Sequence, residues 1–238
     1  MNELTNKTAL VTGASSGIGE AISQQLLDAG CKVIGIGRDF SKSSIDSARF
    51  ETICLDLADL QGCAPTLKTL CSKHAFDYLV HSAGSGLFGS IEQFSIQQID
   101  NYLRGNLASA LMLAHFLVPG MRQGKSGRIV FIGSESSLNA GKKGALYSAA
   151  KFGIRGLAQA LREDCSKDGI TVSLINPGMV RTPFFQQQNF RPGNSPDNAI
   201  EAADIARLVM HIVHSNPDMV IDEINLSPRN RSIDFGSK

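Results

Sequence analysis

The feature that most constrains the fold is a regular alternation of short apolar runs with longer segments of helical periodicity. Thr8 to Thr12 and Lys32 to Ile36 are typical of buried β-strands, and Glu20 to Ala29 between them carries an apolar stripe with helical spacing. Gly30 follows at the position where a glycine commonly ends a helix. Because strand, helix and strand repeat in this way along the chain, the sequence predicts a parallel sheet covered on both faces.

The rest of the chain continues this pattern. No linker or block of like charges divides it, so we expect a single domain over residues 1–238. The predicted architecture is α/β, a Rossmann-type doubly wound parallel sheet of about seven strands with helices on both faces. We expect the remaining strands over residues 52–55, 78–80, 128–133, 170–175 and 219–226, and the remaining helices over residues 65–73, 99–121, 147–164 and 199–215.

Composition argues against several classes of protein. A net charge of +1 gives no reason to expect a nucleic acid or an anionic membrane as partner. The longest apolar run, Ala110 to Val118, is far shorter than the roughly 20 residues of a membrane span, and the N-terminus lacks the pattern of a signal peptide. The five cysteines form no CxxC pair and no cluster with histidine, which argues against a metal site. We therefore expect a cytoplasmic enzyme or binding protein.

A glycine-rich loop, TGASSGIG from Thr12 to Gly19, joins the first predicted strand to the first predicted helix. In this position a loop presents backbone N–H groups and a helix N-terminus to a pyrophosphate, and its glycines let backbone and ligand approach closely. The spacing is GxxxGxG and no GK[ST] follows, which argues against an ATP-type phosphate loop. The sequence therefore predicts a dinucleotide site.

A second motif places Tyr147 and Lys151 one helical turn apart. A free tyrosine has a pKa of about 10, and a neighbouring ammonium lowers it by favouring the phenolate. Such a tyrosine donates a proton to a carbonyl oxygen during reduction or accepts one from an alcohol during oxidation. Ser134 follows the predicted strand 128–133, from which its hydroxyl could hold the same oxygen. Taken alone, this spacing fits a packed phenol and a solvated charge equally well.

The motifs occur together in the order and spacing of one family. They are TGASSGIG, Asp56-Leu57, HSAG at residues 81–84, Asn106, Ser134, YSAAK at residues 147–151, and NPG at residues 176–178 with Thr182. On these residues the chain resembles the short-chain dehydrogenase/reductase family over essentially its whole length. The resemblance implies an oxidoreductase in which a nicotinamide cofactor exchanges hydride with a small-molecule carbonyl or alcohol.

The resemblance also implies roles for individual residues. Ser134 matches the serine that orients the substrate oxygen, and Tyr147 matches the acid/base. Lys151 matches the lysine that lowers the phenol's pKa and holds the nicotinamide ribose, and Asn106 matches the asparagine that distorts its helix and ties the lysine into a water chain. Besides Tyr147 and Lys151, the implied cofactor contacts are Gly13, Ser15, Ser16, Gly17, Ile18 and Gly19 at the pyrophosphate, Asp56 and Leu57 at the adenine, Ala83 and Gly84 along the ribose, and Pro177, Gly178, Val180 and Thr182 at the carboxamide.

Cofactor preference depends on the end of the second strand. An acidic residue at position 37 would bind both ribose hydroxyls of NAD and repel a 2′-phosphate. That position holds Gly37, followed by Arg38, whose planar guanidinium suits a phosphate, so NADP(H) is favoured over NAD(H). The alternative is that Arg38 pairs with Asp39 in solvent, or that Asp39 reaches a ribose hydroxyl. Ser16 stands where some relatives carry a further basic residue.

One position departs from the family pattern. The usual NNAG is HSAG here, so His81 replaces an asparagine that braces the sheet in family members. We interpret His81 as a structural substitute that hydrogen-bonds within the core rather than as a catalytic group.

The sequence leaves the substrate open. Pocket walls are expected from residues 135–144 and from a substrate loop at about residues 184–198, and the polar tail 229–238 is expected to be mobile or to wrap on a neighbouring subunit of a homodimer or homotetramer. Aromatic residues of the loop could form a lid or pack its hinge, and nearby cations could attract an anion or be solvated. These residues are Phe184, Phe185 and Phe190, and Lys142, Lys143 and Arg191.

Two classes of function remain. The first is an NADP(H)-dependent oxidoreductase that interconverts a carbonyl and a secondary alcohol, with a 3-oxoacyl carrier-protein reductase or a small hydroxy-acid dehydrogenase as alternatives within the class. A nucleotide-sugar epimerase is disfavoured, because little chain follows the last predicted strand. The second class is a catalytically idle nucleotide-sensing scaffold, against which the intact set of Asn106, Ser134, Tyr147 and Lys151 argues.

Overall fold

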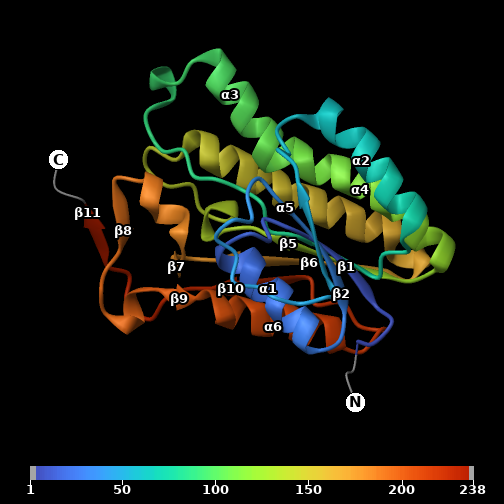
Figure 1. Cartoon of the computed structure of the whole chain (residues 1–238). Coiled ribbons are helices and arrows are strands. Elements are labelled where there is room, and N and C mark those ends of the chain that lie inside the picture. The colour runs from blue at the N-terminus through green and yellow to red at the C-terminus, as the bar shows by residue number, and fades with distance from the viewer. Residues whose placement is uncertain (1–3, 236–238) are drawn as a thin grey trace.

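The structure, a computed structural model, describes residues 4–235. Seven parallel strands form its main sheet in the order β3-β2-β1-β4-β5-β6-β10 (Figure 1). The order reverses between β1 and β4, which creates the crevice where doubly wound folds bind ligands. The predicted Rossmann-type sheet is confirmed. Its strands are β1 (Thr8–Thr12), β2 (Lys32–Gly37), β3 (Phe50–Cys54), β4 (Tyr78–His81), β5 (Gly127–Ile132), β6 (Ile170–Pro177) and β10 (Glu223–Leu226).

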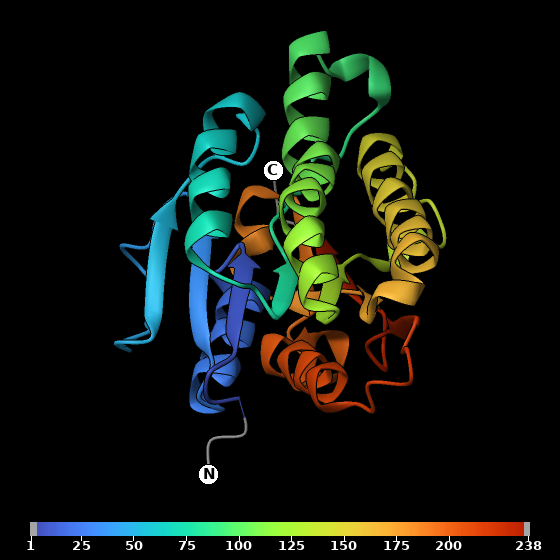
Figure 2. The ribbon, with the colours of Figure 1, turned by 90° about the vertical axis from the view of Figure 1, so that its right-hand side faces the viewer.

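Helices cover both faces of this sheet. One row holds α2 (Leu60–Lys73), α4 (Ser109–Gly124) and α5 (Ala145–Cys165), and the opposite face holds α1 (Gly17–Asp28) and α6 (Ala202–His214) (Figure 2). The central strands alternate their side chains between two apolar layers. In β5, Ile129 and Phe131 pack under the first row, whereas Val130 and Ile132 pack under α1 and α6. Burial on both faces explains why these strands are continuous apolar runs in the sequence.

The helix predicted over residues 99–121 is interrupted in the structure. It consists of α3 (Ile96–Leu103), one π-helical turn (Arg104–Ala108) and α4. Within the π turn, the Asn106 side-chain amide donates to the Tyr102 carbonyl oxygen at 2.9 Å. That side chain occupies an acceptor which a regular α-helix would give to its own backbone, so the turn widens.

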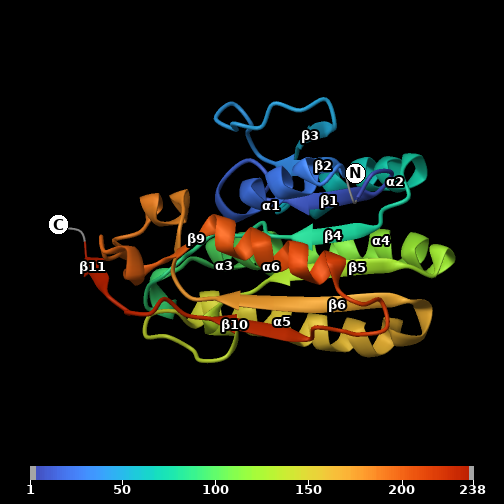
Figure 3. The same ribbon diagram turned by 90° about the horizontal axis from the view of Figure 1, so that it is seen from below.

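Other boundaries also differ from the prediction. α2 begins at Leu60 rather than Pro65, because the Asp59 carboxylate caps it by accepting from the Gly62 backbone N–H. α6 begins at Ala202 rather than Ala199. The last sheet strand is confined to β10, which lies at the sheet edge beside β6 (Figure 3).

The substrate loop and the C-terminal tail are joined to each other. β7 (Val180–Arg181) pairs with β9 (Ile200–Glu201), and between them β8 (Phe190–Pro192) pairs antiparallel with β11 (Ile233–Phe235). The Gly193 N–H also donates to the Ser232 carbonyl oxygen at 3.0 Å. The expectation of a mobile tail or one on a neighbouring subunit is therefore wrong through Phe235, because the tail completes a two-stranded sheet with its own loop. Residues 236–238 lie outside the described chain.

Candidate active site

The loop after β1 fits a pyrophosphate. Gly13 and Gly17 have φ values of +67° and +58°, which side-chain-bearing residues rarely adopt. A Cβ on Gly13 would lie 3.0 Å from the Ala83 backbone, and one on Gly19 would lie 2.2 Å from the Gly13 carbonyl oxygen. The loop therefore turns sharply and meets α1 at Gly17, so that the helix N-terminus opens toward the crevice.

Three of the four residues predicted as catalytic, Ser134, Tyr147 and Lys151, line one cavity of about 110 Å³, whereas Asn106 is buried and does not line it. The cavity lies at the C-terminal ends of β4, β5 and β6. Predicted residues that line it are Ile18, Gly84, Ser134, Tyr147, Lys151, Pro177, Gly178, Val180 and Thr182. The prediction did not include Ser82, Ser85, Ile132 and Gly133, which also line it, and it gave Phe184 and Phe185 only as lid candidates.

The side chains that shift the pKa of Tyr147 are Ser134 and Glu135. Burial raises the pKa of Tyr147, the hydrogen bond from the Ser134 hydroxyl opposes that rise, and the nearby Glu135 carboxylate adds to it. The Lys151 ammonium lies 5.9 Å from the centroid of the Tyr147 ring and donates to the Ile132 carbonyl oxygen at 3.0 Å. Lys151 is not among the groups that shift the pKa of Tyr147 here, so a lowering of that pKa by Lys151 stays a prediction. Burial lowers the pKa of Lys151 itself to about 8.

Asn106 supports the loop that follows β4. Its Oδ1 accepts from the Ser85 N–H at 2.8 Å. A Cβ on Gly84 would lie 3.1 Å from that oxygen and 3.8 Å from Lys151 Nζ, so Asn106 and Lys151 both border Gly84. The π turn thus carries an asparagine to the back of the site, as the resemblance implied for a helix-distorting residue.

At the end of β2, the side chains of Arg38 and Asp39 differ in their contacts. Arg38 is exposed and, within residues 4–235, makes no ion pair or side-chain hydrogen bond. The Asp39 carboxylate is occupied by Ser41, whose N–H and hydroxyl donate to it at 2.8 and 2.9 Å. A Cβ on Gly37 would lie 2.9 Å from Ser15 Oγ, so a larger residue there would displace Ser15. Asp56 and Leu57 follow the end of the neighbouring strand β3.

His81 forms a buried hydrogen bond, as predicted. Its Nδ1 lies 2.9 Å from Thr12 Oγ1, and that oxygen accepts from the Ala83 N–H at 3.1 Å. Thr12 Oγ1 and His81 Nδ1 thus share one hydrogen bond, whose donor is set by the imidazole tautomer. Among the described residues, Nε2 has no partner. Burial, with a smaller contribution from Lys151, lowers the pKa of His81 to about 3, so the ring is neutral near pH 7.

A closed cycle of aromatic rings stands over the cavity and includes a residue that the motifs did not reveal. Phe88 follows HSAG in a glycine-rich loop, and only its aromatic character hinted at a role. The loop cations Lys142, Lys143 and Arg191 are exposed and do not line the cavity. The centroid distances around the cycle are 4.9 Å for Tyr147–Phe88, 5.0 Å for Phe88–Phe190, 5.8 Å for Phe190–Phe185, 5.1 Å for Phe185–Phe184 and 6.3 Å for Phe184–Tyr147.

Comparison with known proteins agrees with this geometry. The short chain dehydrogenase family matches residues 7–192. The chain belongs to that family. An uncharacterized oxidoreductase of Staphylococcus saprophyticus is 30% identical to this dehydrogenase, over 96% of this chain and 100% of the relative. A similar protein of Staphylococcus epidermidis is 28% identical, with the same shares covered.

Solved structures show the same fold. A metagenomic short-chain oxidoreductase in complex with NADP has a TM-score of 0.80 and 28% identity, over 95% of this chain and 98% of that one. The closed form of a serine dehydrogenase complexed with NADP+ has a TM-score of 0.78 at 21% identity, over 92% and 93% of the two chains. The protein is thus a short-chain oxidoreductase. Among the described residues of this dehydrogenase, no helix has the length and apolarity needed to cross a membrane.

Proposed function

We propose that this dehydrogenase uses NADP(H) to interconvert a carbonyl and a secondary alcohol, with Tyr147 as the acid/base. The observation that carries the proposal is that Ser134, Tyr147 and Lys151 line one cavity, where the Ser134 side chain acts to lower the pKa of the phenol. When bound, the nicotinamide would supply or accept the hydride. The protein would supply position, exclusion of water and the proton.

Each catalytic residue has a separate task in this proposal. The Ser134 hydroxyl orients the substrate oxygen beside the phenol, and Tyr147 transfers the proton to or from that oxygen. Lys151 is buried at the same cavity and would hold the ribose with its ammonium. Asn106 keeps the loop at Gly84 in place through the Ser85 N–H. Proton transfer and binding would therefore depend on different side chains.

The preference for NADP(H) is supported by the end of β2. Arg38 is exposed with its guanidinium unpaired in residues 4–235, whereas Asp39 is held by Ser41. A 28% identical relative is described in complex with NADP. We propose that Arg38 binds the 2′-phosphate and that the other contacts are those implied by the family: Gly13, Ser15, Ser16, Gly17, Ile18, Gly19, Asp56, Leu57, Ala83, Gly84, Pro177, Gly178, Val180 and Thr182.

The aromatic cycle favours an uncharged substrate with an apolar group next to its carbonyl. Phe88 and Phe184 contact the Tyr147 ring, and Phe185 and Phe190 complete the cycle. Lys151 is the one cationic side chain among the described residues that line the cavity. A small hydroxy acid would lack a partner for its carboxylate there, since Lys151 is assigned to the ribose. An acyl carrier protein would have to be recognised outside the cavity, where Lys142 and Lys143 are exposed.

We propose further that residues 1–238 act as one nucleotide-binding unit with residues 184–198 as substrate loop, and that the chain forms a homodimer or homotetramer. Leu111 on α4 and Phe152 on α5 support the oligomer, since they are 49% and 43% exposed on neighbouring helices. Light scattering during size-exclusion chromatography should give a multiple of the chain mass. A monomer at micromolar concentration would contradict this part.

The test of the main proposal compares wild type, Tyr147→Phe, Ser134→Ala and Arg38→Ala. NADPH titrations should show wild-type affinity in the first two variants and a loss in Arg38→Ala toward the NADH value. Turnover of an aryl ketone should fall by about 10²- to 10⁴-fold in Tyr147→Phe. NADPH binding without Tyr147-dependent turnover of aryl ketones, 2-oxo acids or 3-oxoacyl thioesters would favour the idle scaffold instead.

A further inference from the structure

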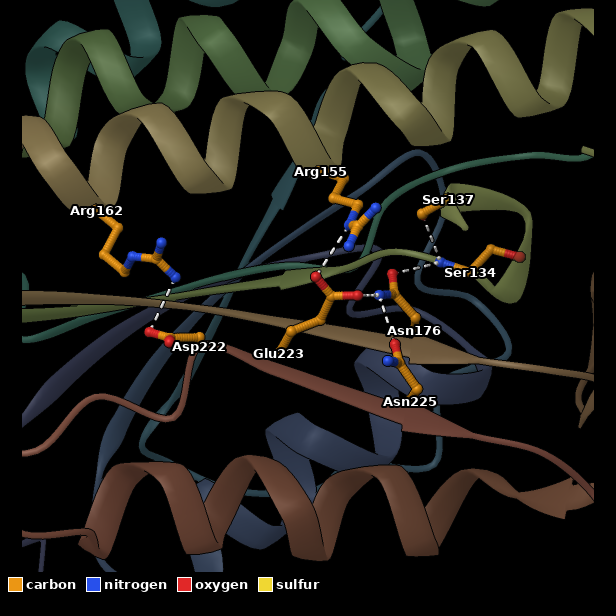
Figure 4. Close-up of polar contacts among 8 residues, drawn as sticks. All are labelled: Ser134, Ser137, Arg155, Arg162, Asn176, Asp222, Glu223 and Asn225. Carbon is orange, nitrogen blue, oxygen red and sulfur yellow. Dashed lines mark hydrogen bonds and ion pairs between the residues drawn. The ribbon is translucent and has the colours of Figure 1, made fainter. Parts of the chain in front are cut away.

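A chain of polar side chains crosses the edge of the sheet and ends at the Ser134 backbone (Figure 4). Arg155 Nε on α5 donates to Glu223 Oε2 on β10 at 2.9 Å. The Asn176 side-chain N–H group on β6 donates to Glu223 Oε1 and to Asn225 Oδ1, both at 2.9 Å. Asn176 Oδ1 then accepts from the Ser134 N–H at 3.3 Å. The elements α5, β6 and β10 thus share one continuous network with Ser134, which follows β5.

The network fixes which way the Asn176 amide faces. The Glu223 carboxylate and Asn225 Oδ1 both face the amide as acceptors, so the NH₂ group must point at them and Oδ1 must point at Ser134. Asn176 is fully buried, which makes a reversed amide costly because it would leave buried polar atoms unpaired. Gly133 keeps the approach close, since a Cβ there would lie 2.1 Å from Asn176 Oδ1.

The two ends of the network are the two halves of the catalytic site. Ser134 follows β5, whereas Tyr147, Lys151 and Arg155 are spaced one helical turn apart along α5. Arg155 therefore anchors the helix that carries the phenol, and Asn176 anchors the residue that binds the phenol. We propose that Arg155, Glu223 and Asn176 are positioning residues that hold the Ser134 hydroxyl in register with Tyr147. The inference deepens the proposed function and rests on it for its kinetic readout.

The chain offers a matched control for this proposal. Asp222 precedes Glu223 and pairs with Arg162 at 2.9 Å, two helical turns beyond Arg155 on α5 (Figure 4). This pair also joins the helix to the C-terminal segment, but no contact among the described residues connects it to Asn176. The Asp222→Asn variant therefore removes an ion pair between α5 and the C-terminal segment without changing a partner of Asn176.

The first measurement does not depend on catalysis. Hydrogen-exchange mass spectrometry of a peptide containing Ser134 should show faster exchange of its N–H in Glu223→Gln than in wild type, and no change in Asp222→Asn. Unchanged exchange in Glu223→Gln, or equal acceleration in both variants, would overturn the proposal. This result stands even if the proposed reaction proves wrong.

The second measurement is kinetic. In Glu223→Gln we expect kcat to fall about 10- to 100-fold, the scale of a small misplacement of a reacting group, while KM and the NADPH affinity stay within about twofold. In a Ser134→Ala background, Glu223→Gln should lower kcat little further, because Glu223 acts on catalysis through Ser134. An equal loss in both backgrounds would overturn the proposal.

The pH dependence gives a third readout. The groups that act on the phenol are Ser134 and Glu135 from the loop after β5, and Lys151 lies 5.9 Å from the ring on α5. Since the Ser134 hydrogen bond lowers the pKa of Tyr147, a loosened Ser134 should move the pH midpoint of alcohol oxidation upward in Glu223→Gln. The midpoint in Asp222→Asn should equal that of wild type. The same midpoint in wild type, Glu223→Gln and Asp222→Asn would contradict the proposal that Glu223 acts through Ser134.

Discussion

The His81 ring lies 2.9 Å from the Thr12 hydroxyl, which itself receives the Ala83 N–H at 3.1 Å. This pair joins the ends of β1 and β4 at the crevice of the fold. His81 thereby performs the bracing task of the asparagine that is usual at this position. Unlike an amide, the imidazole is a titratable group, and burial lowers its pKa to about 3.

The first prediction concerns acid stability. The folded pKa of His81, about 3, lies below the unfolded value of 6.5, so the stability it contributes is complete above pH 6.5 and is lost as pH falls. Between pH 6.5 and 5, wild type should lose up to about 2 kcal/mol more than His81→Asn. Urea unfolding at both pH values measures this, and parallel losses in the two proteins would contradict it.

The second prediction concerns alkaline stability. The pKa of Lys151 is lowered from 10.5 to about 8, so above pH 8 the unfolded chain binds more protons at this residue than the folded one. Folding stability of wild type relative to Lys151→Met should therefore rise between pH 8 and 10, by about 2 kcal/mol. Taking the difference between the two unfolding free energies removes the contribution of titratable groups that both proteins share. A flat difference curve would show that the ammonium is not desolvated.

The third prediction uses the three tyrosines in a chain that has no tryptophan. Burial raises the pKa of Tyr78 to about 12 and also raises the pKa values of Tyr102 and Tyr147. Phenolate absorbance at pH 10 should therefore be clearly lower in the folded protein than in the urea-unfolded protein. Ser134→Ala should lower it further, since it removes the bond that favours the Tyr147 phenolate. Equal absorbance of folded and unfolded protein would refute the shifts.

The fourth prediction concerns cofactor preference. Gly37→Asp should weaken NADPH binding by about tenfold or more, because a carboxylate there repels the 2′-phosphate. NADH binding should not improve in this variant, since the new Cβ lies 2.9 Å from Ser15 Oγ. The double variant Gly37→Asp with Ser15→Gly removes that conflict and should bind NADH more tightly than Gly37→Asp alone. Fluorescence titration with both cofactors tests this, and tight NADPH binding in either variant would contradict it.

The main sheet was predictable because its strands are buried on both faces and therefore stand out as apolar runs. β1 has the predicted bounds, and the other central strands differ by a few residues. Periodicity gave the wrong helix boundaries where a single side chain hydrogen-bonds to the backbone. Apolar periodicity missed the π turn that the Asn106 amide opens, which only the resemblance implied, and it missed the Asp59 cap that starts α2 before Pro65.

The candidate catalytic set came from the resemblance to a family, since the spacing of Tyr147 and Lys151 alone was not specific. The electrostatics of this set were not predicted. The Lys151 ammonium points to the Ile132 carbonyl oxygen at the end of β5, and the spacing of residues along the chain does not encode that contact. The sequence analysis did not identify a role for Phe88 or for the Asn176–Glu223 pair. Their contacts form only in the tertiary fold.

The antiparallel pair of β8 and β11 has a consequence for engineering this protein. Substrate range in such a fold would ordinarily be altered by randomising the loop alone. Here the loop is paired with the C-terminal tail, so the residues that form this small sheet are divided between two stretches of the gene, one around Phe190 and one around Ile233. A mutant library that varies both together explores loop positions that neither stretch reaches by itself, and it leaves Ser134, Tyr147 and Lys151 untouched.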